Sequence, residues 1–221
     1  MLLVEPQPHV ASQLADITQQ FGGTVAIEQA AICAHDGNVT FYYLPDINPS
    51  SGAITRPHLR RLKSFPVATS QLASMSKEHI LRQQRHVHNG LKLAAYIREL
   101  IVPCYSVPTL LKRHAIRPHK LDVLTVDAEG YDLTILDAVD FQLIAPQLLI
   151  WEQVHVNAQP TLGGRNRTAS FISKLEQQHA YRCNSQSDLE NVMCVKRSWL
   201  AVGRGAAGCR QAFIWPGHEE V

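Results

Sequence analysis

The chain has 221 residues, of which 45% are hydrophobic and 18% are charged. This length and composition are typical of a globular protein that can build one sizeable core without a disulfide or a structural metal. The net charge of +2 is too small to predict a nucleic-acid-binding protein.

The chain opens with the pattern strand, helix, strand. Residues 1–6, MLLVEP, form an apolar run that ends in an acidic residue, which predicts a strand. Apolar residues then recur at steps of four, three and four from residue 10 to residue 21, which predicts a helix ended by Gly22 and Gly23. Residues 24–33, TVAIEQAAIC, predict a second strand.

A turn and a long insertion follow. Asp36 and Gly37 are typical turn residues, and the stretch NVTFYYLP after them predicts a strand that returns along the sheet edge. Residues 46–76 are rich in Pro, Ser, Gly and basic side chains, so we expect a long loop or insertion there. Its basic residues either form a solvated surface or contact an anionic substrate.

Residues 76–97 predict mainly helical structure with Ser76 as the N-cap, and the spacing of His79, His86 and His88 does not predict a metal site. Strands are then expected at 99–107, 146–155, 181–186 and 191–197, and helices at 108–116 and 168–180. We expect one domain over residues 1–198 and a loosely attached tail over residues 199–221.

The most informative stretch is residues 121–141, LDVLTVDAEGYDLTILDAVDF. An apolar run ends in Asp127 and Glu129, and apolar residues at helical spacing follow, which predicts a buried parallel strand, an acidic turn and a helix. Glu5 and Glu152 also end predicted strands. In open α/β sheets ligands bind beyond the carboxyl ends of the strands, so we expect these carboxylates to face one crevice. The alternative is that Glu129 or Asp132 is only an acidic residue in the first turn of a helix.

The compartment is predicted from cysteines and hydropathy. Five scattered cysteines with no CxxC pair predict free thiols in a reducing compartment. No apolar run reaches the roughly 18 residues of a membrane span, and no positively charged segment precedes the apolar N-terminal residues. We therefore expect a cytoplasmic protein without a membrane partner. The residues predict no particular oligomeric state.

The sequence resembles the FkbM-type S-adenosylmethionine-dependent methyltransferases. The resemblance depends on VEPQP at 4–8, AAIC and HDGNVTF at 30–41, YSVPTLL at 105–111, LDVLTVDAEGYDLTIL at 121–136, PQLLIWEQVH at 146–155, and the closing HAYRCNS and NVMCV. The resemblance implies a Rossmann-like, seven-stranded α/β fold and methyl transfer, usually to a hydroxyl oxygen of a small molecule or sugar. It also implies S-adenosylmethionine as the cofactor.

The resemblance further implies a role for each acidic residue. Glu5 would hold the cofactor ribose, because a carboxylate accepts hydrogen bonds from two hydroxyls at once. Asp36 would lie near the adenine. Asp127 and Glu129 would lie beside the methyl donor and the acceptor hydroxyl, with Asp127 as the base, and Glu152 would face the acceptor pocket. Alternatively, the carboxylates hold a divalent ion that polarises the acceptor.

One motif of the family is missing from the sequence. In this fold a glycine-rich turn of the type DxGxNxG follows the first strand, and nothing precedes Leu2 that could supply it. We therefore expect an N-terminally truncated domain, and the chain is either an active methyltransferase or a non-catalytic remnant or binding module. An NAD-dependent oxidoreductase fits less well, because no GxGxxG motif is present.

Overall fold

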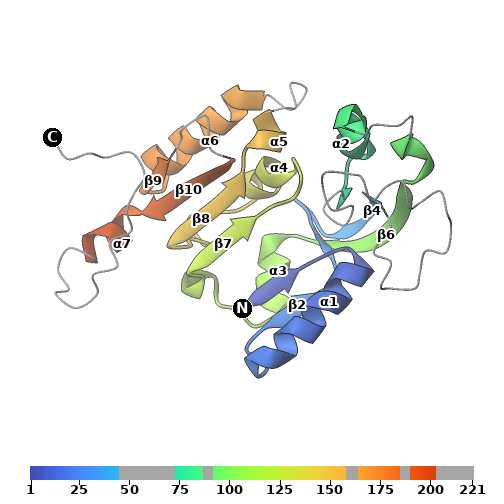
Figure 1. Ribbon diagram of the computed structural model, residues 1–221. Helices are drawn as coiled ribbons and strands as arrows, with labels where there is room; N and C mark the ends of the chain where they lie inside the picture. The colour runs from blue at the N-terminus through green and yellow to red at the C-terminus, as the bar shows by residue number, and fades with distance from the viewer. Residues whose placement is uncertain (45–72, 87–91, 158–163, 185–189, 203–221) are drawn as a thin grey trace.

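The computed structural model describes residues 1–44, 73–86, 92–157, 164–184 and 190–202. Its strands form three sheets among these residues (Figure 1). The first has the order β1-β2, the second β7-β8-β10-β9 and the third β3-β6-β4-β5. The mixed α/β class predicted from the sequence is therefore confirmed. Most of the predicted insertion at 46–76 and most of the predicted tail lie outside the described residues.

The N-terminal unit forms as predicted. Strand β1 (Leu2–Val4) pairs in parallel with β2 (Ala26–Glu28), and helix α1 (Pro8–Thr18) with a short 3₁₀ turn (Gln19–Phe21) connects them. Gly22 ends the helical segment with a φ of +59°, a left-handed conformation that glycine adopts without steric cost.

The predicted strand at 24–33 divides into two short strands in different sheets. The chain bends after β2, where the amide of Ala30 donates to the carbonyl of Glu28, and β3 (Ala31–Ile32) then pairs with β6 in the third sheet. The bend explains why one apolar run does not make one strand. It also carries the chain from the first sheet to the third.

The third sheet is built around β6 (Arg98–Tyr105). This strand lies between β3, to which it is parallel, and β4 (Gly37–Tyr43), to which it is antiparallel; β4 in turn pairs with β5 (Ala73–Ser74). Two residues separate β5 from helix α2 (Lys77–Arg82), and 3₁₀ turns follow at Gln83–His86 and Leu93–Ala95. The predicted N-cap is confirmed, because the Ser76 hydroxyl oxygen accepts a hydrogen bond from the His79 amide.

The second sheet contains most of the core. Strand β7 (Val123–Val126) pairs in parallel with β8 (Leu148–Glu152), and β10 (Asn191–Lys196) is antiparallel to both β8 and β9 (Tyr181–Asn184). Further helices are α3 (Val107–Arg113), α4 (Asp132–Asp137), α5 (Val154–Asn157), α6 (Gly164–Gln178) and α7 (Arg197–Val202), with a 3₁₀ turn at Pro118–Lys120. The predicted strand, acidic turn and helix at 121–141 are thus confirmed. The fully buried Leu149, Trp151, Tyr181 and Leu175 form the centre of this core.

The first and second sheets are not joined by strand pairing. Within the described residues β1 pairs only with β2, and β7 pairs only with β8. Accordingly, the Val123 side chain in β7 is 51% exposed, although the sequence predicts a buried strand there. The expected seven-stranded sheet is therefore present as separate parts, and the N-terminal truncation stays a prediction.

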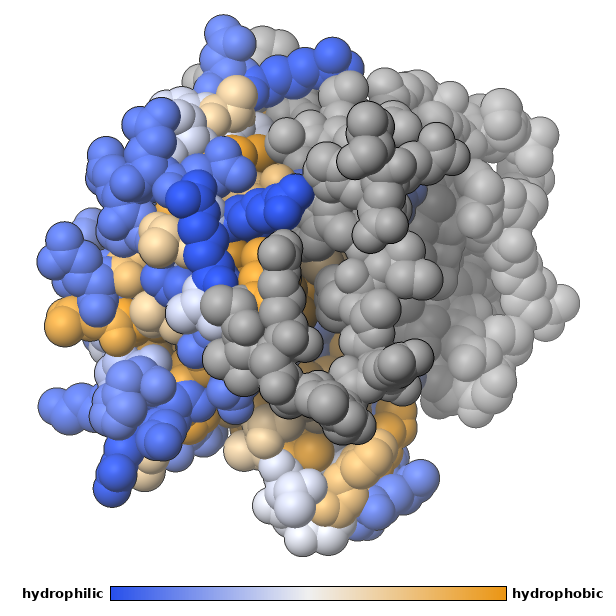
Figure 2. Space-filling model, turned by 90° about the vertical axis from the view of Figure 1, so that its left-hand side faces the viewer, coloured by the Kyte–Doolittle hydropathy of each residue, from blue (hydrophilic) through white to orange (hydrophobic). Residues whose placement is uncertain are grey.

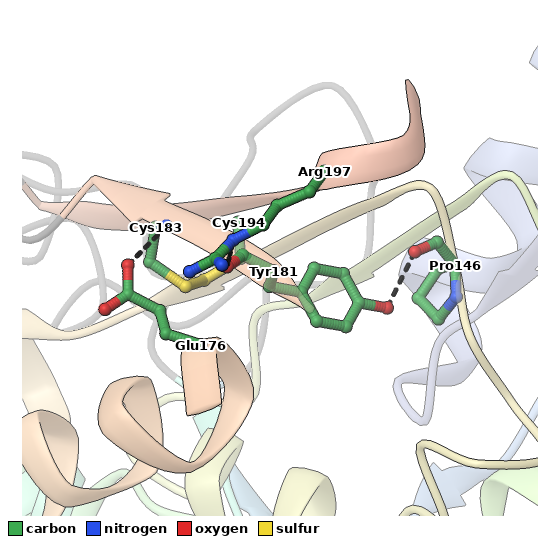
Figure 3. The surroundings of a disulfide bond; sticks show 6 residues. All are labelled: Pro146, Glu176, Tyr181, Cys183, Cys194 and Arg197. Carbon is green, nitrogen blue, oxygen red and sulfur yellow. Dashed lines mark hydrogen bonds between the residues drawn. A yellow bond between two sulfur atoms is a disulfide. The ribbon is translucent and has the colours of Figure 1, made fainter. Parts of the chain in front are cut away.

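The cysteines correct the expectation of free thiols. Cys33 and Cys104 form a disulfide between the segment after β3 and β6, and Cys183 and Cys194 form one between β9 and β10 (Figure 3). The second pair is directly opposite in the antiparallel ladder, a register that the spacing of cysteines along the sequence does not reveal. The cytoplasmic location stays a prediction.

Two surface properties bear on partners. Among the described residues, none of the helices has both the length and the apolar character that crossing a membrane requires. Figure 2 views the molecule from the side of β9 and α7, where hydrophilic residues occupy most of the described surface and small hydrophobic areas lie between them.

Candidate active site

The turn after β7 has an unusual backbone. Glu129 has a φ of +50° and Gly130 a φ of +96°, so two consecutive residues are left-handed. A residue with a side chain rarely adopts this conformation, and such residues concentrate at functional sites. The Glu129 carbonyl accepts a hydrogen bond of 3.5 Å from the Ser74 hydroxyl, which connects the turn to β5.

Asp132 holds this turn against the end of β8. Its side chain is fully buried, and its carboxylate accepts hydrogen bonds from the amides of Ala128 (3.4 Å), Gly130 (3.1 Å) and Glu152 (3.3 Å). Burial raises the pKa of Asp132 to about 7. The sequence indicates an acidic residue in the first turn of a helix here, but it does not reveal that this residue joins two strand ends.

Glu152 and His155 extend the site from β8 into α5. His155 Nδ1 lies 2.5 Å from Glu152 Oε2 and 3.2 Å from Glu129 Oε2. The hydrogen bond with Glu152 raises the pKa of His155, which favours the protonated imidazole between the two carboxylates. His155 belongs to the stretch WEQVH that supports the resemblance, but sequence reasoning gave it no role.

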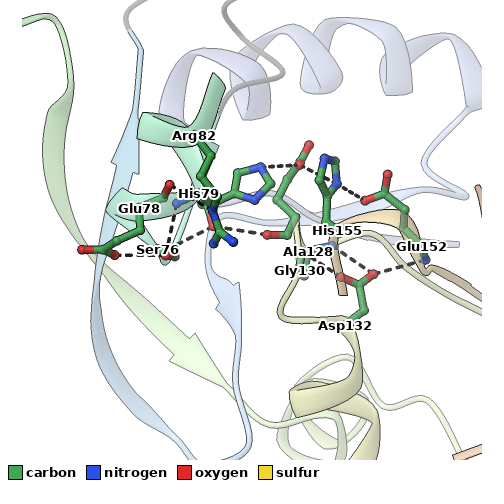
Figure 4. A network of polar contacts seen from close by, with 11 residues as sticks. Ser76, Glu78, His79, Arg82, Ala128, Gly130, Asp132, Glu152 and His155 are labelled. Atoms are coloured by element: carbon green, nitrogen blue, oxygen red, sulfur yellow. Dashed lines mark hydrogen bonds and ion pairs between the residues drawn. The ribbon is translucent and has the colours of Figure 1, made fainter. Parts of the chain in front are cut away.

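His79 approaches from the opposite side, on α2 (Figure 4). Its side chain is 3% exposed, and Nε2 lies 3.1 Å from Glu129 Oε2, while its ring contacts that of His155 edge to face at 4.5 Å. Although this is ion-pair distance, Nε2 has no well-aligned hydrogen bond in the part of the chain that the structure describes. The spacing of the histidines in the sequence did not predict a role for His79, because its neighbours in the site, Glu129 and His155, are distant in the chain.

Asp127 completes a group that we call the carboxylate–histidine cluster: His79, Asp127, Glu129, Glu152 and His155. Asp127 remains open to solvent on one side, so a ligand can reach it. Partial burial raises its pKa, and the negative charges of Glu152 and Glu129 raise it further. The structure therefore brings together all three residues that the sequence predicts as catalytic.

Glu5 and Asp36, the other predicted cofactor residues, have local partners instead. Glu5 accepts a 2.7 Å hydrogen bond from the Gln7 amide at the start of α1, and burial raises its pKa. Asp36 accepts hydrogen bonds from the Ser106 amide and the Thr109 hydroxyl, both of 2.7 Å, at the start of α3. The bond from the Ser106 amide is the main cause of its lowered pKa. No ion pair joins Glu5 or Asp36 to the cluster among the residues described.

A pocket of about 400 Å³ lies elsewhere, between α3 and the segment after α4. Its lining is mainly apolar and includes Leu111, Ile116 and Leu143, and it contains none of the predicted site residues. Its lining also includes Lys112, Arg117 and Asp140, but none of the strand ends that carry the predicted site residues, so we place the chemistry at the carboxylate–histidine cluster instead.

The comparison with known families decides the identity of the domain. The model of the methyltransferase FkbM domain matches residues 1–183. The chain belongs to the FkbM methyltransferase family. No curated protein and no solved structure matches it. Membership in the family implies S-adenosylmethionine-dependent methyl transfer and a Rossmann-like methyltransferase fold, while the predicted domain limits of 1–198 and 199–221 stay predictions.

The residues of this FkbM domain fit the implied cofactor at one point. Glu5 directly follows β1, and a carboxylate has about four positions that accept hydrogen bonds, of which the backbone and the side chain of Gln7 use two. Glu5 therefore keeps the capacity to accept the ribose hydroxyls. Both oxygens of Asp36 already accept hydrogen bonds from Ser106 and Thr109 at the start of α3, so its predicted place near the adenine has weaker support.

Proposed function

We propose that this FkbM methyltransferase transfers a methyl group to a hydroxyl oxygen of a small molecule or sugar, at the carboxylate–histidine cluster. The observation that carries the proposal is the gathering of Asp127, Glu129 and Glu152 beyond the carboxyl ends of two parallel strands, β7 and β8. Ligands of open α/β sheets bind at this edge, and a hydroxyl acceptor needs a base there.

Asp127 is the proposed base. S-adenosylmethionine, when bound, supplies an electrophilic methyl group whose bond to sulfur breaks as the new carbon–oxygen bond forms. The acceptor hydroxyl loses its proton in this step, and Asp127 takes it. Its raised pKa suits this role, because a carboxylate with a higher pKa is a stronger base.

Glu129 and Glu152 position the acceptor in this proposal. Glu152 forms a hydrogen bond with His155 Nδ1 and Glu129 lies at ion-pair distance from it, and the hydrogen bond with Glu152 raises the pKa of His155, which favours the imidazolium. The imidazolium partly compensates their negative charges and fixes their orientation. Positioning of this kind supplies a large part of the acceleration in a direct displacement, which requires the acceptor oxygen to approach the methyl group in line with the leaving sulfur.

A second candidate function is a binding module without turnover. The observation that favours it is the absence of strand pairing between the first sheet, which carries Glu5, and the second sheet, which carries Asp127, among the described residues. If the cofactor must contact both sheets, its binding site would be held together only by side-chain packing between the sheets, without hydrogen bonds between their strands.

Calorimetric titration of S-adenosylhomocysteine tests the proposal, followed by methyl transfer from labelled S-adenosylmethionine to a panel of hydroxylated compounds. We expect binding that Glu5→Gln weakens about tenfold or more, through the loss of hydrogen bonds to a charged group. The control Glu99→Gln removes an exposed carboxylate that pairs with Lys77, and it leaves binding unchanged. Binding without turnover supports the binding module, and no binding contradicts both candidates.

A further inference from the structure

The centre of the carboxylate–histidine cluster has the donor set of a metal site. His79 comes from α2 and His155 from α5 (Figure 4). Together with Glu129 from the turn after β7, each offers one potential ligand atom at the same place. All three atoms lie within 4.8 Å of one another. Three separate elements therefore converge on one point.

Two of the three distances between these atoms match those expected around one ion. Two ligands at about 2.1 Å from a metal, at tetrahedral or octahedral angles, are about 3.0–3.4 Å apart. Glu129 Oε2 lies 3.1 Å from His79 Nε2 and 3.2 Å from His155 Nδ1. The third pair, the two histidine ring nitrogens, lies within 4.8 Å, and two ligands of one ion are at most about 4.2 Å apart, so binding by all three requires at most a small movement of one ring.

The state of His79 points to a ligand independently. Its side chain is almost completely buried, and Nε2 faces the Glu129 carboxylate without a well-aligned hydrogen bond in the described part of the chain. A buried polar atom in that state is unfavourable unless something else binds it. A cation between Nε2 and the carboxylate would satisfy both.

We propose that His79, Glu129 and His155 bind one divalent transition-metal cation. Imidazole nitrogens together with a carboxylate favour Zn²⁺, Mn²⁺, Fe²⁺ or Co²⁺ over Mg²⁺ and Ca²⁺, which prefer oxygen ligands alone. The hydrogen bond between His155 Nδ1 and Glu152 has to break and the Nδ1 proton has to leave when the ion binds. Glu152 then lies beside the ion, and Asp132 fixes the backbone on which Glu152 and the turn depend.

The ion would define the acceptor class, and this step rests on the proposed function. Three protein ligands leave coordination positions open, and a hydroxyl bound there has a lowered pKa. An acceptor with two neighbouring oxygens, such as a vicinal diol, occupies two such positions at once. Such an ion adjoins Asp127, which takes the proton.

The test uses tag-free full-length protein treated with EDTA and then dialysed. Zn²⁺ is titrated by calorimetry, and Co²⁺ is titrated by visible absorption, which reports the coordination of the metal directly. We expect one equivalent of each ion to bind, and His79→Ala and His155→Ala each to weaken binding about tenfold or more. The control His119→Ala removes an exposed histidine outside the cluster and leaves binding unchanged.

Each contrary result overturns the proposal. Failure of the wild-type protein to bind one equivalent does so, as does binding that persists in both histidine variants. Circular dichroism checks that the variants are folded, and if His79→Ala is not, His79→Gln and His155→Ala provide the comparison. S-adenosylhomocysteine binding to the same EDTA-treated protein separates the two proposals: if this ligand binds and the metals do not, only the metal site fails.

Discussion

The backbone amide of Glu152 donates a hydrogen bond of 3.3 Å to the buried carboxylate of Asp132. This contact joins the end of β8 to the start of α4, and the other two bonds of Asp132 hold the turn that carries Glu129. One buried side chain outside the cluster thus fixes the relative positions of two of its carboxylates.

Removal of the Asp132 carboxylate is expected to destabilise the fold. Asp132→Ala leaves three amides without their acceptor, and we expect the free energy of unfolding in urea to fall by about 3 kcal/mol. The control Asp137→Ala removes a half-exposed carboxylate that pairs with Arg167, and we expect it to lose less than about 1 kcal/mol. Equal effects of the two substitutions would contradict the structural role of Asp132.

The pKa of Asp132 predicts a pH dependence of stability. Burial raises this pKa from 3.8 to about 7, so between these values the unfolded chain releases a proton that the folded chain retains. The contribution of Asp132 is therefore complete below about pH 4 and is lost as the pH rises to about 7. We expect the unfolding free energy of the wild-type protein to fall between pH 5 and pH 8 relative to that of Asp132→Asn. A difference between the two proteins that does not change with pH would disprove the raised pKa of Asp132.

Asp127 is expected to be required for turnover rather than for cofactor binding. Asp127→Asn keeps the shape of the side chain but removes the base, so we expect kcat to fall about a hundredfold to ten-thousandfold. The affinity for S-adenosylhomocysteine should stay within about twofold, because the substitution leaves Glu5 in place. The matched control is Asp122→Asn, an exposed residue just before β7. Full activity of Asp127→Asn would show that another group takes the proton.

The disulfides predict the chemical state of four cysteines. Under non-reducing conditions Cys33, Cys104, Cys183 and Cys194 should resist alkylation, as measured by the mass of the intact protein and its peptides. Cys183→Ala should reduce the unfolding free energy by about 2–4 kcal/mol in the oxidised protein and by much less after reduction. Alkylation of all four cysteines in the folded, unreduced protein would restore the interpretation as free thiols.

Much of the fold followed from local pattern. The periodicity of residues 10–21, the glycines after them and the apolar run before Asp127 gave the correct element types. They did not give the degree of burial, because Ile17, Phe21 and Val123 are 50%, 55% and 51% exposed. The division of residues 24–33 between two sheets was not predictable, since both short strands have the same apolar composition. The pairing of Cys183 with Cys194 depends on the register of β9 and β10, which composition does not determine.

The sequence predicted three of the five residues of the carboxylate–histidine cluster. Asp127, Glu129 and Glu152 follow from their positions at strand ends, because parallel strands present their carboxyl ends at one edge. Tertiary packing of α2 and α5 brings His79 and His155 to Glu129. The spacing of these residues along the chain does not predict this contact. The role of Asp132 was not predictable for another reason. Its carboxylate accepts hydrogen bonds from backbone amides, and every residue except proline has such an amide, so the residue types do not indicate these contacts.

The left-handed backbone of Glu129 has a consequence for how this position tolerates change. Glycine adopts a φ of +50° without steric cost, so Glu129→Gly should relieve about 1 kcal/mol of backbone strain while it removes the carboxylate that meets both histidines. Conformational preference and chemistry thus favour different residues at the same point. Selection for thermal tolerance alone would therefore favour glycine at this position, whereas the proposed chemistry requires the carboxylate.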